Sequence, residues 1–133
     1  MQKYTVILHS IGKERVLAKS HGFEITLGAK SGDPSYGFNA AETLLAAFGT
    51  CLMTNLNSIS RQMHLQIEEV EIQVEGIRLE NPPRISRINY TVKVKSSEPE
   101  EKLNKLLELC NKYGTVTNTL LFGTETSGNI VKI

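Results

Sequence analysis

The chain has 133 residues, of which 40% are hydrophobic and 22% charged, and its formal net charge is +1. This length accommodates one hydrophobic core, which predicts a single domain over residues 1–133. The near-neutral charge, with lysines and arginines dispersed along the chain, argues against a nucleic-acid partner or a role on a membrane surface.

The N-terminal residues have the pattern of a strand. They lack the charged region, long apolar segment and small-residue cleavage site of a signal peptide. Two cysteines in a chain of this size do not make a disulfide scaffold. We therefore expect a cytoplasmic protein in which the thiols are reduced.

Three short strands are predicted at the beginning of the chain. Apolar and polar residues alternate over residues 2–10, and strand patterns return over residues 15–19 and 23–27. Gly12 and Gly22 lie in the connections between these segments. Short strands joined by tight turns predict an antiparallel meander.

A long apolar helix is predicted after the glycine-rich loop at residues 29–37. Asn39 is expected to be its N-cap, with the Glu42 carboxylate reaching back to the cap amide, and the helix is expected to continue to about Met63. A helix that is hydrophobic on nearly every side belongs inside a protein, and this one is interrupted too early to span a bilayer. It is expected to be the central packing element and to bury Cys51.

Strands and helices are segregated along the chain rather than alternating, which predicts the α+β class. The breaker at residues 81–83 is expected to form a hairpin loop longer than the minimal turn. The other expected elements are strands over residues 65–79 and 84–95, a helix capped by Ser97, a short helical segment over residues 115–121, and a strand over residues 123–133.

The two cysteines are the candidate reactive groups. A thiol that attacks a peroxide O–O bond needs an acid or cation beside the leaving oxygen, and Arg15 and Lys13 are the candidate cations for Cys51. Each cysteine also has a packing interpretation, because Cys51 lies in an apolar helix and Cys110 continues a leucine stripe. Capping alone explains Glu42.

No metal or nucleotide site is expected. The three histidines, His9, His21 and His64, share no i, i+4 spacing and have no acidic cluster beside them. The loop glycines are not followed by the Lys-Ser/Thr pair of a phosphate-binding loop. We therefore expect no cofactor.

Three stretches together resemble the OsmC-like family, which includes the osmotically inducible and organic hydroperoxide resistance proteins. They are residues 39–52, residues 65–76 and the run Lys112-Tyr113-Gly114-Thr115-Val116-Thr117-Asn118-Thr119-Leu120. The family pattern is an Asn-Pro-Glu cap, a Leu/Ala-rich helix closing on Gly-Ser-Cys, a Val-Glu-Val strand, and Lys-Tyr-Cys-Pro-Val-Ser-Asn-Thr-Leu. The resemblance implies an OsmC-like fold, with antiparallel sheets wrapped around the long central helix in an intertwined homodimer.

The resemblance also implies a thiol-dependent peroxidase that reduces organic hydroperoxides and is recycled by a thiol reductant. Cys51 matches the peroxidatic cysteine, which the family holds beside a glutamate and an arginine at the dimer interface. Arg15 lies near the position of the family arginine, and Glu42 lies one residue after the position of the family glutamate. Cys110 is the candidate resolving cysteine, with an external thiol as the alternative.

Two of the departures from the family pattern fall at positions that have a chemical role in the family. Ala41 occupies the position of the catalytic glutamate, and Gly114 occupies that of the resolving cysteine, about one helical turn after Cys110. These departures support an alternative function, in which a non-catalytic family member binds a small lipophilic ligand in the apolar pocket at the dimer interface.

Overall fold

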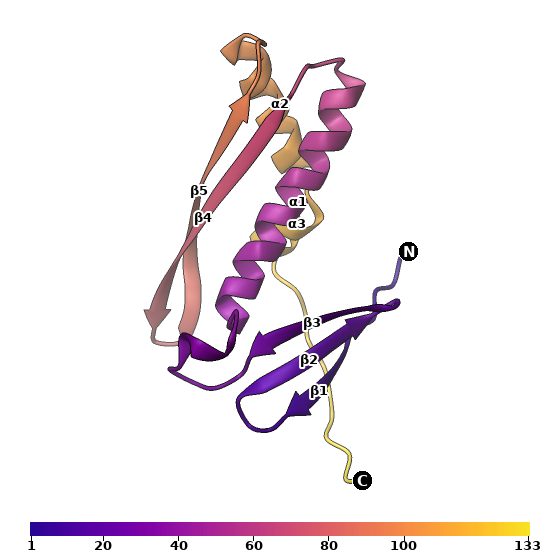
Figure 1. The fold of residues 1–133 in the computed structure, drawn as a ribbon, viewed down its shortest axis with the longest axis vertical. Helices are drawn as coiled ribbons and strands as arrows, with labels where there is room; N and C mark the ends of the chain where they lie inside the picture. The colour runs from indigo at the N-terminus through magenta and orange to yellow at the C-terminus, as the bar shows by residue number, and fades with distance from the viewer. The chain divides into compact units, whose positions relative to one another are not determined.

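The computed structural model describes all 133 residues, which divide into two compact units. Unit 1 comprises residues 1–46 and 76–87, and unit 2 comprises residues 47–75 and 88–133. The long helix α1 (Ala40–Gln62) and the hairpin formed by β4 (Glu69–Glu80) and β5 (Pro83–Lys95) contribute residues to both units (Figure 1). None of the helices combines the length and apolar character that a membrane span requires.

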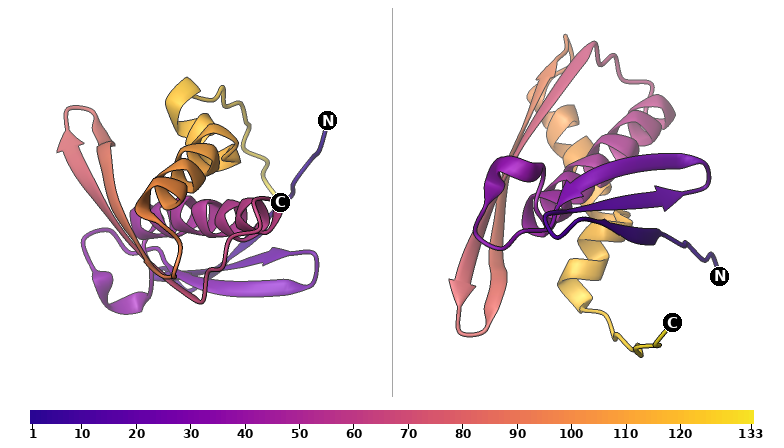
Figure 2. Two further views of the ribbon diagram at one scale, coloured as in Figure 1. Left: turned by 90° about the horizontal axis from the view of Figure 1, so that it is seen from above. Right: turned by 60° about the horizontal axis from the view of Figure 1, so that its bottom comes forward.

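In unit 1, the strands β1 (Ile7–Ile11), β2 (Arg15–Ser20) and β3 (Phe23–Gly28) form the predicted antiparallel meander (Figure 2). Leu8, Ala18 and Ile25 are partners in one row across the three strands. The first strand begins later than predicted, because β2 ends at Ser20 and leaves residues 2–5 without a strand to pair with.

The start of α1 also belongs to unit 1 and follows the short 3-10 helix η1 (Pro34–Tyr36). The Asn39 Oδ1 atom accepts a hydrogen bond from the Glu42 amide at 2.8 Å, and Glu42 Oε1 accepts one from the Asn39 amide at 3.1 Å. This reciprocal pair confirms the predicted cap. The helix ends at Gln62, one residue before the expected end.

Unit 2 contains the buried core. Its helices are the rest of α1, α2 (Glu100–Lys112) and α3 (Thr115–Phe122), the last of which confirms the predicted short helical segment. Residues at every fourth position of α1 are buried, which defines one apolar stripe along the helix. The fully buried cluster consists of Phe48, Leu52, Leu56, Leu106 and Cys110.

The hairpin bounds the core on one side, because only one face of its strands packs against the buried cluster. In the part of β4 within unit 2, partly buried side chains alternate with exposed ones, as expected for a strand with one face on a core. The partly buried residues that pack on the cluster from the hairpin are Val70, Ile72, Val74, Ile88, Tyr90, Val92 and Val94. The opposite face carries mainly charged and polar side chains.

The boundaries predicted for the hairpin and for the helix that follows it are also wrong. Strand β4 begins at Glu69, four residues after the predicted start. The hairpin loop contains only Asn81 and Pro82, because Pro83 is already the first residue of β5, where a proline needs no amide hydrogen for the ladder. Helix α2 has Pro99 and not Ser97 at its N-cap, with no side-chain cap bond. The extended backbone of Pro99 places the first helical residue at Glu100, too far along the chain for Ser97 to cap it.

The predicted strand at residues 123–133 is also wrong, since these residues form no strand. Their β-branched side chains fit a strand, but the chain pairs no other strand with them. Ile130 and Val131 are 99% and 70% exposed. A strand pattern without a partner does not make a strand, because the backbone groups then bond to water.

We expect Leu52→Ala to lower the free energy of unfolding by about 2–5 kcal/mol, because the substitution leaves a cavity in the core. Leu52 is 1% exposed and is central to the buried cluster. Urea denaturation followed by circular dichroism measures this loss. The matched control is Leu121→Ala, since Leu121 is 74% exposed and its truncation should cost less than about 0.5 kcal/mol. Equal losses in the two variants would contradict the assigned core.

Candidate functional site

Cys51 lies in α1 beside the buried stripe and not within it. Phe48 and Leu52 are 5% and 1% exposed, whereas the Cys51 side chain is only partly buried. The expectation that the helix buries Cys51 is therefore wrong, because the stripe passes through positions 48, 52 and 56 and leaves position 51 on its flank. A partly exposed thiol is open to a small substrate.

Cys110 is the second free thiol and lies in the last turn of α2. It is 1% exposed and belongs to the buried cluster with Phe48 and Leu52. Burial raises the pKa of the Cys110 thiol, and the charge of Cys51 raises it further. The structure thus brings the two predicted site cysteines into the same part of unit 2.

Hydrogen bonds from two asparagine side chains hold the helix turn that carries Cys110. Asn55 Nδ2 in α1 donates a hydrogen bond to the Cys110 carbonyl at 3.2 Å. Asn111 Nδ2 in α2 donates to the Tyr90 hydroxyl in β5 at 2.7 Å. The Tyr90 ring in turn contacts the Phe48 ring, with 5.4 Å between the centroids. The end of α2 is therefore held to both α1 and the hairpin.

Sequence reasoning missed these polar residues. Asn55 had a usable signal, because it lies four residues after Cys51 and therefore on the same side of the predicted helix. Tyr90 and Asn111 had none, since the residues lie on different elements and nothing in the local pattern relates them.

Gly114, which occupies the position of the family's resolving cysteine, is closely surrounded by other atoms. A Cβ atom at this residue would lie 2.9 Å from Thr117 Oγ1 and 3.1 Å from the Cys110 carbonyl oxygen. Contacts this short require neighbouring atoms to move. A cysteine at this position would therefore require the Thr117 side chain and the end of α2 to shift, and Cys110 is the second thiol that the chain itself offers.

The other two predicted site residues have local contacts within unit 1. The Glu42 carboxylate accepts the cap hydrogen bond from the Asn39 amide, which confirms the capping interpretation. The Arg15 guanidinium carbon lies 5.8 Å from the centroid of the Tyr36 ring, and Lys30 Nζ lies at the same distance from that ring. A role for Arg15 or Glu42 in the chemistry of Cys51 stays a prediction.

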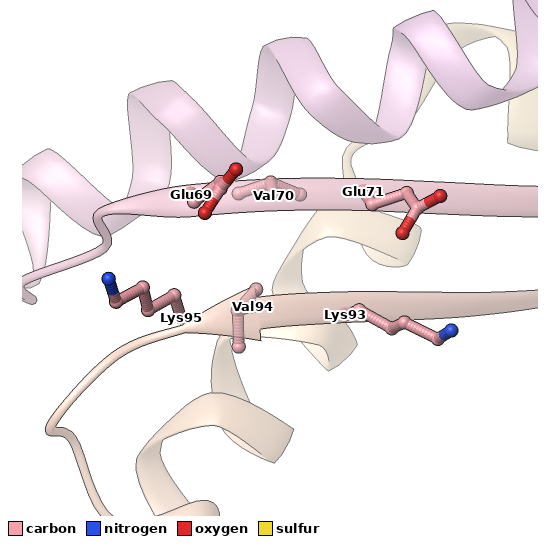
Figure 3. Close-up of a pocket in the computed structure, with 6 residues that line it drawn as sticks. All are labelled: Glu69, Val70, Glu71, Lys93, Val94 and Lys95. Atoms are coloured by element: carbon pink, nitrogen blue, oxygen red, sulfur yellow. The ribbon is translucent and has the colours of Figure 1, made fainter.

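The remaining surfaces offer no second chemical site. No group of three or more His, Cys, Asp or Glu side chains is arranged to hold a metal ion. A depression of about 530 Å³ lies on the hairpin. Figure 3 shows that its acidic side chains come from β4 and its lysines from β5. It contains no thiol, and the nearby pair of Lys95 and Glu68 lies 3.6 Å apart. Its lining residues are Glu69, Val70, Glu71, Lys93, Val94 and Lys95.

The chain is a small α+β protein with two free cysteines in the same unit. The model of the OsmC-like protein family matches residues 31–127. The chain belongs to the OsmC-like family, which confirms the resemblance read from the sequence.

Similar proteins agree in fold along most of the chain. A protein of Mycoplasma genitalium named hydroperoxide reductase is 24% identical over 123 residues, which cover 90% of this chain and 87% of that protein. The crystal structure of an OsmC-like protein from Mycoplasma pneumoniae has a TM-score of 0.83 at 23% identity and covers 90% and 88% of the two chains. A hypothetical protein from Aquifex aeolicus has a TM-score of 0.81 at 25% identity, covering 93% and 91%. The α+β fold is thus that of the OsmC-like proteins.

The raised pKa of Cys110 predicts that stability falls in alkaline solution. The folded chain keeps this proton above a pH of about 8.5, near which an unfolded cysteine loses it. Because the folded state then binds more protons, the free energy of unfolding is at its full value below that pH and decreases as the pH rises further. Urea denaturation between about pH 7 and pH 10 measures the decrease. It should be smaller in Cys110→Ala, and an identical pH dependence in the two proteins would contradict the prediction.

Proposed function

We propose that this protein is a thiol-dependent peroxidase that reduces small organic hydroperoxides through Cys51. The observation that carries the proposal is the pairing of a partly exposed thiol with a second, buried free thiol in the same unit. Family membership and the name of the Mycoplasma genitalium relative support the same chemistry.

In the first step, the Cys51 thiolate attacks the hydroperoxide. An S–O bond forms, the O–O bond breaks, and the leaving alkoxide takes a proton and departs as an alcohol. The sulfur is thereby oxidised to a sulfenic acid. Because Cys51 lies on the flank of the buried stripe, the peroxide reaches the sulfur without unfolding of the core.

In the second step, Cys110 resolves the sulfenic acid. Its sulfur attacks the Cys51 sulfur, the S–S bond forms, and hydroxide leaves and takes the Cys110 proton to give water. An external dithiol, or two molecules of a monothiol, then reduces the disulfide by way of a mixed disulfide and restores both cysteines, and the reductant leaves as its own disulfide. Since burial raises the pKa of Cys110, this step is expected to be the slower one at neutral pH.

The nucleophile is tested with Cys51→Ser. The variant should consume hydroperoxide at least about 100-fold more slowly than the wild type, because a serine hydroxyl does not replace a thiolate nucleophile. Consumption of cumene hydroperoxide in excess dithiothreitol gives the rate. The matched control, Cys110→Ser, should retain a stoichiometric first turnover. Equal rates in the wild type and Cys51→Ser would end the proposal.

We further propose that the protein works as a homodimer, as the family resemblance implies. The C-terminal residues around Ile130 and Val131 have strand-forming side chains, high exposure and no strand partner in their own chain. Strands β1 and β3 each pair on one side only and have a free edge. A second copy would pair and cover backbone and apolar groups that one chain leaves open.

The dimer is tested by light scattering after size-exclusion chromatography. The mass should equal that of two chains, and Val131→Asp should weaken the association because it places a charge among the apolar residues of the tail. A single-chain mass for the wild type at micromolar concentration would exclude the dimer.

A further inference from the structure

The Cys110 carbonyl lies at the end of a helix and needs a partner from elsewhere. The last four carbonyls of a helix have no intrahelical donor. If the helix continued, the Gly114 amide would donate a hydrogen bond to the Cys110 carbonyl. It donates instead to the Asn111 carbonyl, at 3.4 Å. Asn55 Nδ2 supplies the missing donor at 3.2 Å, in a partly buried setting.

This hydrogen bond links the backbone of Cys110 to the part of α1 that follows Cys51. Asn55 is one helical turn after Cys51 on α1, so its side chain lies on the same side of the helix as the Cys51 thiol. Its partner is the backbone of Cys110 itself. The bond therefore ties the main chain of one cysteine to the helix turn next to the other.

Disulfide formation depends on the separation and orientation of the two cysteine backbones. Two cysteines can be bridged only when their Cα atoms lie within roughly 7 Å of each other and their Cβ atoms face one another. A helix frays most readily at its ends, and Cys110 lies two residues before Lys112, the last residue of α2. Holding its carbonyl limits the positions that the Cys110 sulfur can take.

We propose that Asn55 is a positioning residue for the second step, which fixes the Cys110 backbone so that its sulfur reaches the sulfenic acid of Cys51. The inference rests on the proposed function, since it assigns Asn55 to the resolution step of that reaction. Because the Asn55 amide donates to the Cys110 carbonyl, we expect its removal to leave the first step unchanged.

The test measures the two steps separately in Asn55→Leu, which keeps the size of the side chain and removes its donor. Consumption of the first equivalent of hydroperoxide should occur at the wild-type rate, and dimedone should trap more of the Cys51 sulfenic acid than in the wild type, because its competitor Cys110 reacts more slowly. Formation of the Cys51–Cys110 disulfide, followed by intact mass, should be about threefold to tenfold slower, as expected for the loss of one hydrogen bond. Asn55→Gln, which retains an amide donor, should recover part of the rate.

Asn118→Leu is the matched control. Asn118 Nδ2 also donates to a backbone carbonyl, that of Lys112 at 3.2 Å, but this bond does not involve α1. Its loss should leave disulfide formation unchanged, and thermal unfolding shows whether each variant keeps its fold. A wild-type rate in Asn55→Leu, a faster one, or an equal slowing in Asn118→Leu would overturn the inference.

A second oxidant separates this inference from the proposed function. Diamide accepts two electrons and two protons from a dithiol and forms the same disulfide without a peroxide. If the hydroperoxide fails to oxidise Cys51, the proposed function is wrong, while the rates with diamide still test Asn55. Slower disulfide formation with diamide in Asn55→Leu than in Asn118→Leu supports the positioning role, and equal rates refute it.

Discussion

The packing of α1 against α2 is the contact on which the rest of unit 2 depends. Phe48, Leu52 and Leu56 from α1 meet Leu106 and Cys110 from α2, and the inner face of the hairpin covers this cluster. Each of these side chains is at most 5% exposed, so the hydrophobic effect stabilises the contact with little contribution from the charged surface. Because Cys110 is a member of the cluster, the position of one thiol is a direct product of core packing.

The same packing gives the two thiols different environments. Cys51 lies on the flank of the apolar stripe and keeps some contact with solvent, whereas Cys110 lies inside the cluster. Burial raises the pKa of Cys110 and thereby keeps it protonated when Cys51 reacts. One thiol is therefore suited to meet a substrate from outside, and the other is protected until an oxidised sulfur stands beside it.

Local sequence patterns predicted most of the elements, since the Asn39–Glu42 cap, the helical run through Cys51 and the three short strands are all present. Local patterns could not predict whether a strand finds a partner, so the segment around Ile130 was predicted as a strand and is not one. Nor could they show that position 51 lies beside the stripe. The link between Asn55 and Cys110 joins residues that are 55 positions apart, and only the folded chain brings them together.

The crowding at Gly114 limits how this chain can change over evolution. A thiol at position 114 would need space now occupied by the Thr117 side chain and by the Cys110 carbonyl oxygen. A cysteine at position 114 therefore needs a shift of the Thr117 side chain or a smaller residue at position 117. Thr117 Oγ1 is itself buried without a hydrogen-bond partner, so this compact arrangement already bears an energetic cost. Positions 114 and 117 are thus expected to be epistatically coupled, since a larger residue at 114 is accommodated more easily when the side chain at 117 is smaller.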